Sequence, residues 1–343
     1  MRRRPIRSLT ALGAAGLLAL TGCGTATTTG PAADTPAAST GEGRTVRAEK
    51  VMRLTQTHQE TGMTLLEGPT FDKNGDLLVV DVTAPAGEPK VLRVDVHRKT
   101  SRAVHTDDRG TYTSAQFSPY DGRVYLTDFS HGDIVSLAPD GGDPRTFFSG
   151  EVDGAPMNPD DLAFDREGNL YVSDSRGMSE GEPKGRVVRI DRTGKHATVL
   201  AAGLAAPNGI SFDARYRGLW YSELTENRIS YLLLDDEGGA ASRHTAVRVD
   251  GGVAQTDSIA VDADGNLYQA LHGRPAMAVY SPHGERLATV EVPARAAAGL
   301  QSATNVAITP GGTRAYLTVS GPAGGYLYGF EALGRGVRQS NGG

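Results

Sequence analysis

One position of a repeating pattern in this chain carries side chains that could bind a metal ion. The residue four places before each copy of the pattern is polar in all six copies: Glu67, Thr113, Asp160, Asn208, Asp257 and Thr304. Carboxylate and amide oxygens are hard donors, which favour Ca²⁺ first, Mg²⁺ or Mn²⁺ next, and Zn²⁺ less. Three carboxylates at one partly dry place would repel each other, and a divalent cation would remove that conflict. Asp and Asn are also ordinary turn residues, so the metal site depends on whether the fold gathers this set.

The repeated pattern is a strand, a tight turn and a second strand. Its copies start at Phe71, Phe117, Phe164, Phe212, Val261 and Ile308, and successive starts are 46 to 49 residues apart. Turn residues with glycine between two apolar runs are typical of a β-hairpin. Two tandem β-sandwiches would not keep one period through the middle of the chain, whereas this period is typical of the blades of a propeller. We therefore predict an all-β fold, a six-bladed β-propeller.

A propeller would bring the polar positions together. The first strand of each blade lines the central channel and the loop before it opens at one mouth, so equivalent residues face a common axis. Four protein ligands would leave room for water or substrate, as a catalytic metal requires. Asp161, one step off this ring, is expected to support the site or cap a turn. We expect the strand near 46–54 to close the propeller by pairing with the last blade.

Four motifs resemble the senescence-marker-protein/gluconolactonase (regucalcin-like) family. They are EGPTFDKNGDLLVVD (67–81), DDLAFDREGNLYVSD (160–174), APNGISFD (206–213) and TDSIAVDADGNLYQA (256–270). The resemblance extends in register over nearly all of 60–330 and implies a six-bladed propeller with one catalytic divalent metal. It is strongest to the drug-responsive lactonase branch, which hydrolyses lactones with calcium in the channel.

The resemblance also implies roles for individual residues. Carried over by motif, the calcium ligands are Glu67, Asp160, Asn208, Asp257 and, as an added contact, Ser258. Asp257 would in addition be the acid/base residue. The branch has a second calcium in a loop before the Asp pair, and its residues have no clear match in 147–157.

The implied activity is calcium-dependent lactone hydrolysis. The cation would polarise the lactone carbonyl, water would attack, and Asp257 would handle the proton transfers. The chain has no Gly-x-Ser-x-Gly motif, so a serine-hydrolase mechanism is not expected. Two alternatives stay open: a phosphotriesterase-like hydrolase on the same site, and a non-catalytic ligand-binding propeller with a structural metal. Three histidines are further candidate bases, although such residues lie more often on the surface: His58, His131 and His272.

The first 45 residues have the features of an export and anchoring signal. Arginines precede a short apolar run at 9–20, and this run ends in LTGC at Cys23, which resembles a bacterial lipobox. A plain signal peptide with an incidental cysteine is the alternative. We divide the chain into a lipoprotein signal peptide (1–22), a lipidated Cys23 with a disordered tether (23–45), the propeller hydrolase domain (46–335) and a flexible tail (336–343). The expected location is extracytoplasmic, lipid-anchored to the outer face of the bacterial cell membrane.

Composition narrows the remaining classes of partner. The chain has 343 residues and a net charge of −5, without a basic patch interleaved with aromatic residues, which argues against nucleic acid as a partner. Cys23 is the only cysteine, so the domain has neither an internal disulfide nor a thiolate metal site. We expect a monomer that acts on a small lactone or ester.

Overall fold

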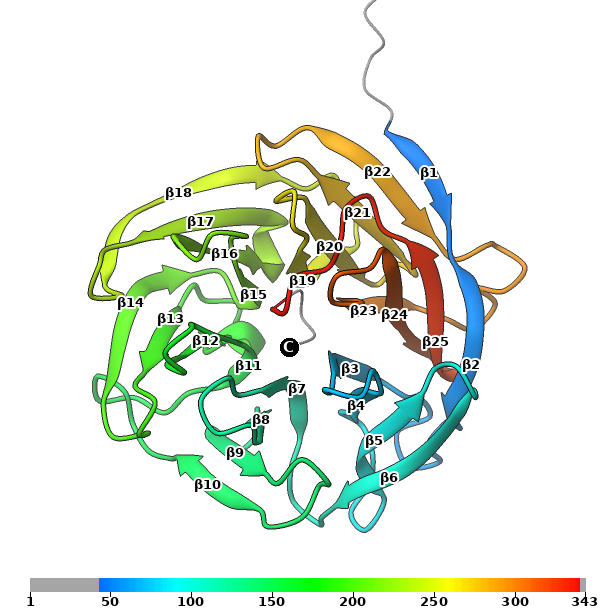
Figure 1. Cartoon of the computed structure of the whole chain (residues 1–343), viewed down its shortest axis with the longest axis horizontal. Helices are drawn as coiled ribbons and strands as arrows, with labels where there is room; N and C mark the ends of the chain where they lie inside the picture. Colours follow the sequence, from blue (N-terminus) through cyan, green and yellow to red (C-terminus); the bar gives the residue numbers. More distant parts are fainter. Residues whose placement is uncertain (1–42, 340–343) are drawn as a thin grey trace, which may run out of the picture. The chain divides into compact units, whose positions relative to one another are not determined.

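Six β-sheets surround a central axis in the computed structural model, which describes residues 43–339 (Figure 1). This architecture confirms the predicted six-bladed β-propeller. The predicted signal peptide, Cys23 and the tether up to residue 42 lie outside the described residues. No helix within 43–339 is long and apolar enough to cross a membrane.

Each blade is built from consecutive strands, with the first strand innermost. The first three blades are β3 (Leu66–Phe71), β4 (Leu77–Asp81), β5 (Pro89–Asp95) and β6 (Thr100–Thr106); β7 (Tyr112–Phe117), β8 (Val124–Asp128), β9 (Asp133–Leu137) and β10 (Arg145–Phe148); and β11 (Pro159–Phe164), β12 (Leu170–Asp174), β13 (Gly185–Ile190) and β14 (Ala197–Leu204). The fourth and fifth are β15 (Pro207–Phe212), β16 (Gly218–Glu223), β17 (Arg228–Leu234) and β18 (Ala240–Arg248); and β19 (Gln255–Val261), β20 (Leu267–His272), β21 (Ala276–Tyr280) and β22 (Arg286–Glu291). The sixth is β23 (Ser302–Ile308), β24 (Arg314–Gly321) and β25 (Gly324–Glu331).

Two N-terminal strands close the ring. Strand β2 (Glu49–Thr55) pairs antiparallel with β25 and completes the sixth blade, as predicted. Strand β1 (Arg44–Arg47) pairs in parallel with β22 of the fifth blade, which the repeat did not indicate. Regular structure therefore begins two residues before the expected start of the propeller. The N-terminal segment thus ties the fifth blade to the sixth.

The hairpin at the inner edge of each blade follows from local turn chemistry. In the third blade, the Asp165 carboxylate accepts the backbone N–H groups of Glu167 (3.0 Å) and Asn169 (2.8 Å). Gly168 takes a φ of 87°, which glycine adopts without a Cβ clash. This turn fixes the register of β11 on β12, and with it the position of the residues at the start of β11.

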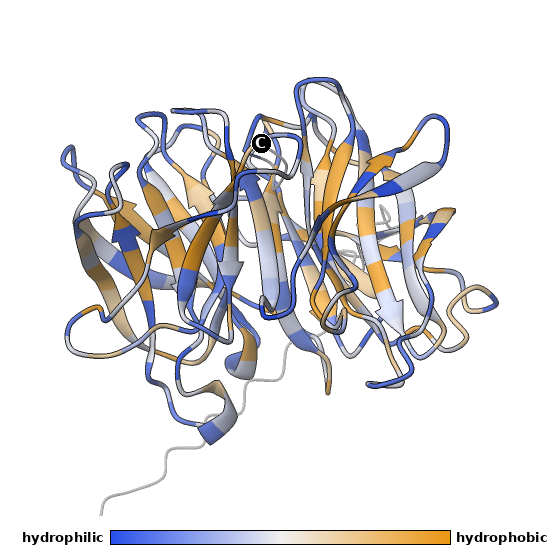
Figure 2. Ribbon diagram, turned by 90° about the horizontal axis from the view of Figure 1, so that it is seen from below, coloured by the Kyte–Doolittle hydropathy of each residue, from blue (hydrophilic) through white to orange (hydrophobic). Residues whose placement is uncertain are grey.

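Apolar packing lies between the blades. Six clusters of buried apolar residues fill the spaces between neighbouring sheets. One of them joins the sixth blade to the first, where Phe71 packs edge-on against Tyr316. Figure 2 shows apolar colouring along the strands and hydrophilic colouring at the loops of the two faces. Burial between the faces of adjacent sheets is what holds the blades around the axis.

The C-terminal segment crosses the end of the channel. Gly336 forms β-bridges with Asp262 and Pro310, which follow inner strands of the fifth and sixth blades. The Tyr216 hydroxyl of the fourth blade donates to the Gln339 amide oxygen at 2.6 Å. Residues 336–339, predicted to be part of a flexible tail, are therefore held to three blades by backbone and side-chain hydrogen bonds.

Candidate metal centre

The predicted ring residues lie at the start of the six innermost strands. Each is the second or third residue of β3, β7, β11, β15, β19 or β23, and all six are buried. The pairing of every innermost strand with its neighbour shifts register at this point, as a β-bulge does. A bulge redirects side chains and is common beside active sites. The fold thus gathers the set at one mouth of the channel, as the period predicted.

Two glycines allow the innermost strands to approach each other at this level. A Cβ on Gly209 would lie 2.4 Å from the backbone nitrogen of Ile259 on the next blade, and one on Gly68 would lie 2.6 Å from that of Ala115. Both distances are shorter than any real carbon contact. The glycines of the EGP and PNG motifs are therefore needed for close packing next to Glu67 and Asn208.

The two threonines of the ring act as ties between blades. The Thr113 hydroxyl donates to the backbone carbonyl of Asp160 at 2.8 Å, and the Thr304 hydroxyl donates to the carbonyl of Leu66. Thr127 of β8 adds a second bond to the Asp160 carbonyl at 2.7 Å. These hydroxyls hold the backbone at Asp160 and at Leu66, the residue before Glu67. The other four side chains of the ring are three carboxylates and one amide.

The three carboxylates destabilise one another's charged form. Burial raises the pKa of Glu67 well above its usual value, and the charges of Asp257 and Asp160 raise it further. The pKa of Asp160 is also raised well above its usual value, by burial first and then by Asp257 and Asp161. Burial raises the pKa of Asp257 as well, and a hydrogen bond from His272 offsets part of that shift. The three acids therefore resist being charged together, and a bound cation would favour their charged forms.

Free oxygens in the ring fit a hard cation. The Glu67 Oε2 and Asn208 Oδ1 atoms are buried without a hydrogen-bond partner. The Asn208 Nδ2 donates to Asp160 Oδ2 at 3.2 Å, so its amide oxygen is the atom left open. A buried acceptor without a donor is costly, and a cation would satisfy both atoms. Within 43–339, no three His, Cys, Asp or Glu side chains already form a metal-binding cluster, so the fit rests on these open oxygens and on the charge.

Other buried acids at the same mouth have basic side chains as partners. Asp174, at the end of β12, binds the Arg186 guanidinium at 2.6 Å, and Glu223, at the end of β16, binds Arg228 at 2.6 Å. Asp81 and Asp128 take the same place in the first two blades and bind histidines. These outer pairs were missed from the sequence, although an acid recurs ten or eleven residues after the start of four copies of the repeat. These basic partners contrast with the ring, where no basic side chain of the described residues lies within ion-pair distance of Glu67 or Asp160.

Asp161 and Ser258 lie one residue further along the innermost strands. The Asp161 carboxylate accepts hydrogen bonds from the Ser114 hydroxyl and the Leu162 N–H, and burial raises its pKa to about 6. The Ser258 hydroxyl also hydrogen-bonds Asp161, and its backbone N–H donates to Asp257 Oδ1 at 3.1 Å. Asp161 is thus a buried support and not a solvent-exposed turn cap. The Ser258 side chain is directed to Asp161, so its predicted contact with the metal gains no support.

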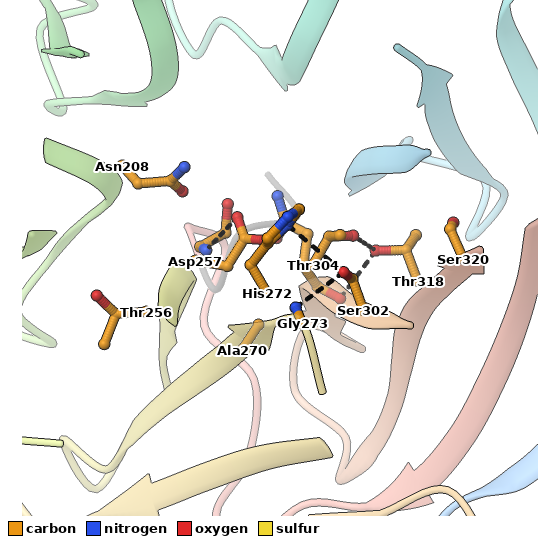
Figure 3. Close-up of polar contacts among 12 residues, drawn as sticks. Asn208, Thr256, Asp257, Ala270, His272, Gly273, Ser302, Thr304, Thr318 and Ser320 are labelled. Atoms are coloured by element: carbon orange, nitrogen blue, oxygen red, sulfur yellow. Dashed lines mark hydrogen bonds and ion pairs between the residues drawn. The ribbon is translucent and has the colours of Figure 1, made fainter. Parts of the chain in front are cut away.

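The three candidate histidines divide into two groups. His58 and His131 bind Asp81 (2.9 Å) and Asp128 (3.0 Å) in the outer pairs, away from the ring. His272 lies beside the ring, with its Nδ1 3.5 Å from Asp257 Oδ2 and 3.5 Å from the Ser302 hydroxyl (Figure 3). The hydrogen bond and charge of Asp257 raise the pKa of His272.

Comparison with known proteins agrees with this architecture. Residues 65–320 match the model of the SMP-30/gluconolactonase/LRE-like region. The lactonase drp35 of Staphylococcus haemolyticus is 25% identical over 315 residues, which cover 88% of this chain and 92% of that protein.

Solved structures share the fold. A calcium-binding regucalcin of Agrobacterium tumefaciens superposes with a TM-score of 0.67 at 17% identity, covering 86% of this chain and 99% of that one. A gluconolactonase of Xanthomonas campestris gives 0.65 at 19%, covering 83% and 97%. Because the family model spans most of the propeller, the chain belongs to the SMP-30/gluconolactonase/LRE-like family.

Proposed function

We propose that the protein is a calcium-dependent lactone hydrolase with its active centre at the carboxylate ring. The single observation that carries this proposal is the ring itself: within 43–339 the buried carboxylates of Glu67 and Asp160 have no basic side chain as an ion-pair partner, and the Glu67 Oε2 and Asn208 Oδ1 atoms have no hydrogen-bond donor. Oxygen-only donors favour Ca²⁺ over softer metals. The family and the lactonase name of its relatives supply the reaction class.

The ring residues have separate tasks in this proposal. Glu67, Asp160, Asn208 and Asp257 would hold the cation, which when bound supplies a Lewis acid for the lactone carbonyl. Asp257 is also the proton acceptor for the attacking water and then the donor to the leaving ring oxygen. The water oxygen joins the carbonyl carbon, the ring C–O bond breaks, and a hydroxy acid leaves. Ser222 and Gln269 hold the Asp257 backbone carbonyl at 2.7 and 2.8 Å, which fixes the carboxylate for both steps.

Metal analysis together with a lactone panel tests the proposal. The purified protein should bind one Ca²⁺ and hydrolyse lactones, and both EDTA and Asp257→Ala should abolish turnover. Activity that survives Asp257→Ala at full strength would refute the mechanism. Paraoxon hydrolysis without lactone hydrolysis would instead support the phosphotriesterase alternative, and cation binding without turnover of any ester would support the binding protein.

We further propose that lipidation of Cys23 anchors the protein outside the cell membrane. The proposal rests on the arginine-rich start, the apolar run and the LTGC motif. With Cys23→Ala, the mature protein should be lost from the membrane fraction. It should instead appear in the medium or accumulate as an uncleaved precursor. Membrane recovery equal to that of the wild type would exclude this anchor.

A further inference from the structure

Arg186 forms the most extensive buried charge network at the mouth of the channel. Its guanidinium donates from Nε to Asp174 Oδ2 at 2.6 Å. The remaining bonds go to three backbone carbonyls of the loop before β11, those of Val152, Ala155 (3.3 Å) and Pro156 (3.1 Å). Both charged side chains are buried. Buried charge-assisted bonds of this kind are strong and geometrically demanding.

The network continues to Asp160 of the ring. The other oxygen of Asp174, Oδ1, accepts the Asn158 N–H at 2.7 Å, and Asp174 pairs with Pro159 across β11 and β12. Ser175 follows directly: its N–H donates to the Asn158 carbonyl at 2.9 Å, and its hydroxyl donates to Asp160 Oδ2 at 3.2 Å. A continuous path therefore runs from the guanidinium to the carboxylate that faces the channel.

The loop that Arg186 holds has little other regular structure. Its only β-contact in this part of the chain is the bridge between Val152 and Ala155, and Asp153 takes a φ of 50°, where non-glycine residues are uncommon. The bonds from Arg186 to three carbonyls thus fix the path of this loop into β11, together with the Asn158 Nδ2, which donates to the Phe129 carbonyl at 3.2 Å, and the buried side chain of Met157. Loss of the guanidinium would leave the three carbonyls, and the buried Asp174 charge, without their donor.

We propose that Arg186 is a positioning residue that sets the affinity of the ring for a divalent cation. It acts through Asp174 and the loop 152–158, which place the Asp160 carboxylate toward Glu67 and Asp257. This inference rests on the proposed function, in that it takes the ring as the cation site. Groups that orient metal ligands typically affect metal affinity by about 10–100-fold.

Calorimetric titration with Ca²⁺, and with Tb³⁺ as a luminescent probe, tests the inference on the full chain. Arg186→Gln should weaken cation binding by about 10–100-fold. Arg186→Lys, which keeps the positive charge but not the planar guanidinium with its several donors, should restore part of the lost affinity. Arg93→Gln is the matched control. Arg93 of β5 also forms a buried pair, with Asp72, and donates to a loop carbonyl, that of Pro139. Asp72 follows the end of β3, so this pair lies at the end of the blade opposite the ring.

The outcomes separate positioning from general stability. Arg93→Gln should lower the melting temperature but leave the dissociation constants within about twofold of the wild type. The inference would be overturned if Arg186→Gln lowered the melting temperature as much as Arg93→Gln does but left the affinity for Ca²⁺ and Tb³⁺ unchanged. If Arg186→Gln does not fold, Arg186→Lys and Asp174→Asn carry the same comparison. Wild-type protein that binds neither ion would remove the proposed function and this inference together, whereas unchanged binding in the variants removes only the inference.

Discussion

At the scale of single residues, the ring and the outer pairs show two ways of keeping a buried carboxylate. Asp174 and Glu223 each have an arginine within bonding distance, whereas Glu67 and Asp160 have none in the part of the chain that the structure describes. A buried charge without a partner is costly, so buried acids that lack a basic partner within the described residues point to a partner from outside the chain. The contrast between acids that have an arginine partner and ring acids that do not indicates the metal centre more clearly than the identity of any one acid.

Asp257→Asn tests the proton-transfer role. The substitution keeps the shape of the side chain but removes its capacity to take up a proton, so kcat/KM for lactones should fall by about 10²–10⁴-fold. Steady-state kinetics at saturating Ca²⁺ measure this, with Asp236→Asn, an exposed acid on the turn between β17 and β18, as control. A fall of less than tenfold would contradict the assignment.

Glu67→Gln should have opposite effects on stability with and without the cation. Without it, the neutral amide relieves burial of a charge and repulsion by Asp257, so the free energy of unfolding should rise by on the order of 1 kcal/mol. With Ca²⁺, the stabilisation by the ion should shrink. Urea unfolding in EDTA and in Ca²⁺ gives both values. A variant that is less stable than the wild type in EDTA would count against mutual repulsion in the ring.

At the scale of elements, the hairpin repeat explains why four separated residues meet. The period and turn chemistry predicted the blades, the inner strands and the common mouth. The bulge at each ring residue could not be predicted, because it depends on pairing with the second strand and on contact with the next blade. The same holds for the threonine ties, since a polar side chain in a repeat does not reveal whether it faces the channel or a neighbouring carbonyl.

Gly209→Ala tests the close approach of β15 and β19. The added Cβ would overlap the backbone at Ile259 and Ser258, so the free energy of unfolding should drop by about 1–3 kcal/mol or more. Cation affinity should weaken too, because Asn208 is adjacent. Gly312→Ala, whose Cβ would be no closer than 3.5 Å to its neighbours, should change stability by less than about 1 kcal/mol. Similar unfolding midpoints for both variants would show that the strands can separate without cost.

At the scale of the whole molecule, ring closure joins the N-terminal strands to the fifth and sixth blades. Closure through β2 was predicted from the strand-like start of the domain. The parallel pairing of β1 with β22 and the crossing at 336–339 were not predicted. Short polar segments have no repeating apolar pattern, and their conformation depends on the surfaces that they contact.

The stability of the whole propeller should depend on pH with a sign set by the ring. Because the pKa values of Glu67, Asp160 and Asp161 are raised on folding, the folded chain keeps protons that the unfolded chain has lost. Without a cation, the melting temperature should therefore fall as the pH rises from about 5 to about 7.5. The gain from Ca²⁺ should grow over the same range, since the ion binds the deprotonated form.

Thermal melts in EDTA and in Ca²⁺ across this pH range measure both trends. Glu67→Gln should flatten the curve recorded in EDTA. A melting temperature in EDTA that rises steadily with pH would contradict the predicted sign.

The crossing at 336–339 affects the side from which small molecules can reach and leave the ring. The segment covers part of the end of the axis opposite the ring, where it is held to three blades. In the proposed function, lactone would therefore reach the carboxylates, and hydroxy acid would leave them, from the mouth at which the ring lies.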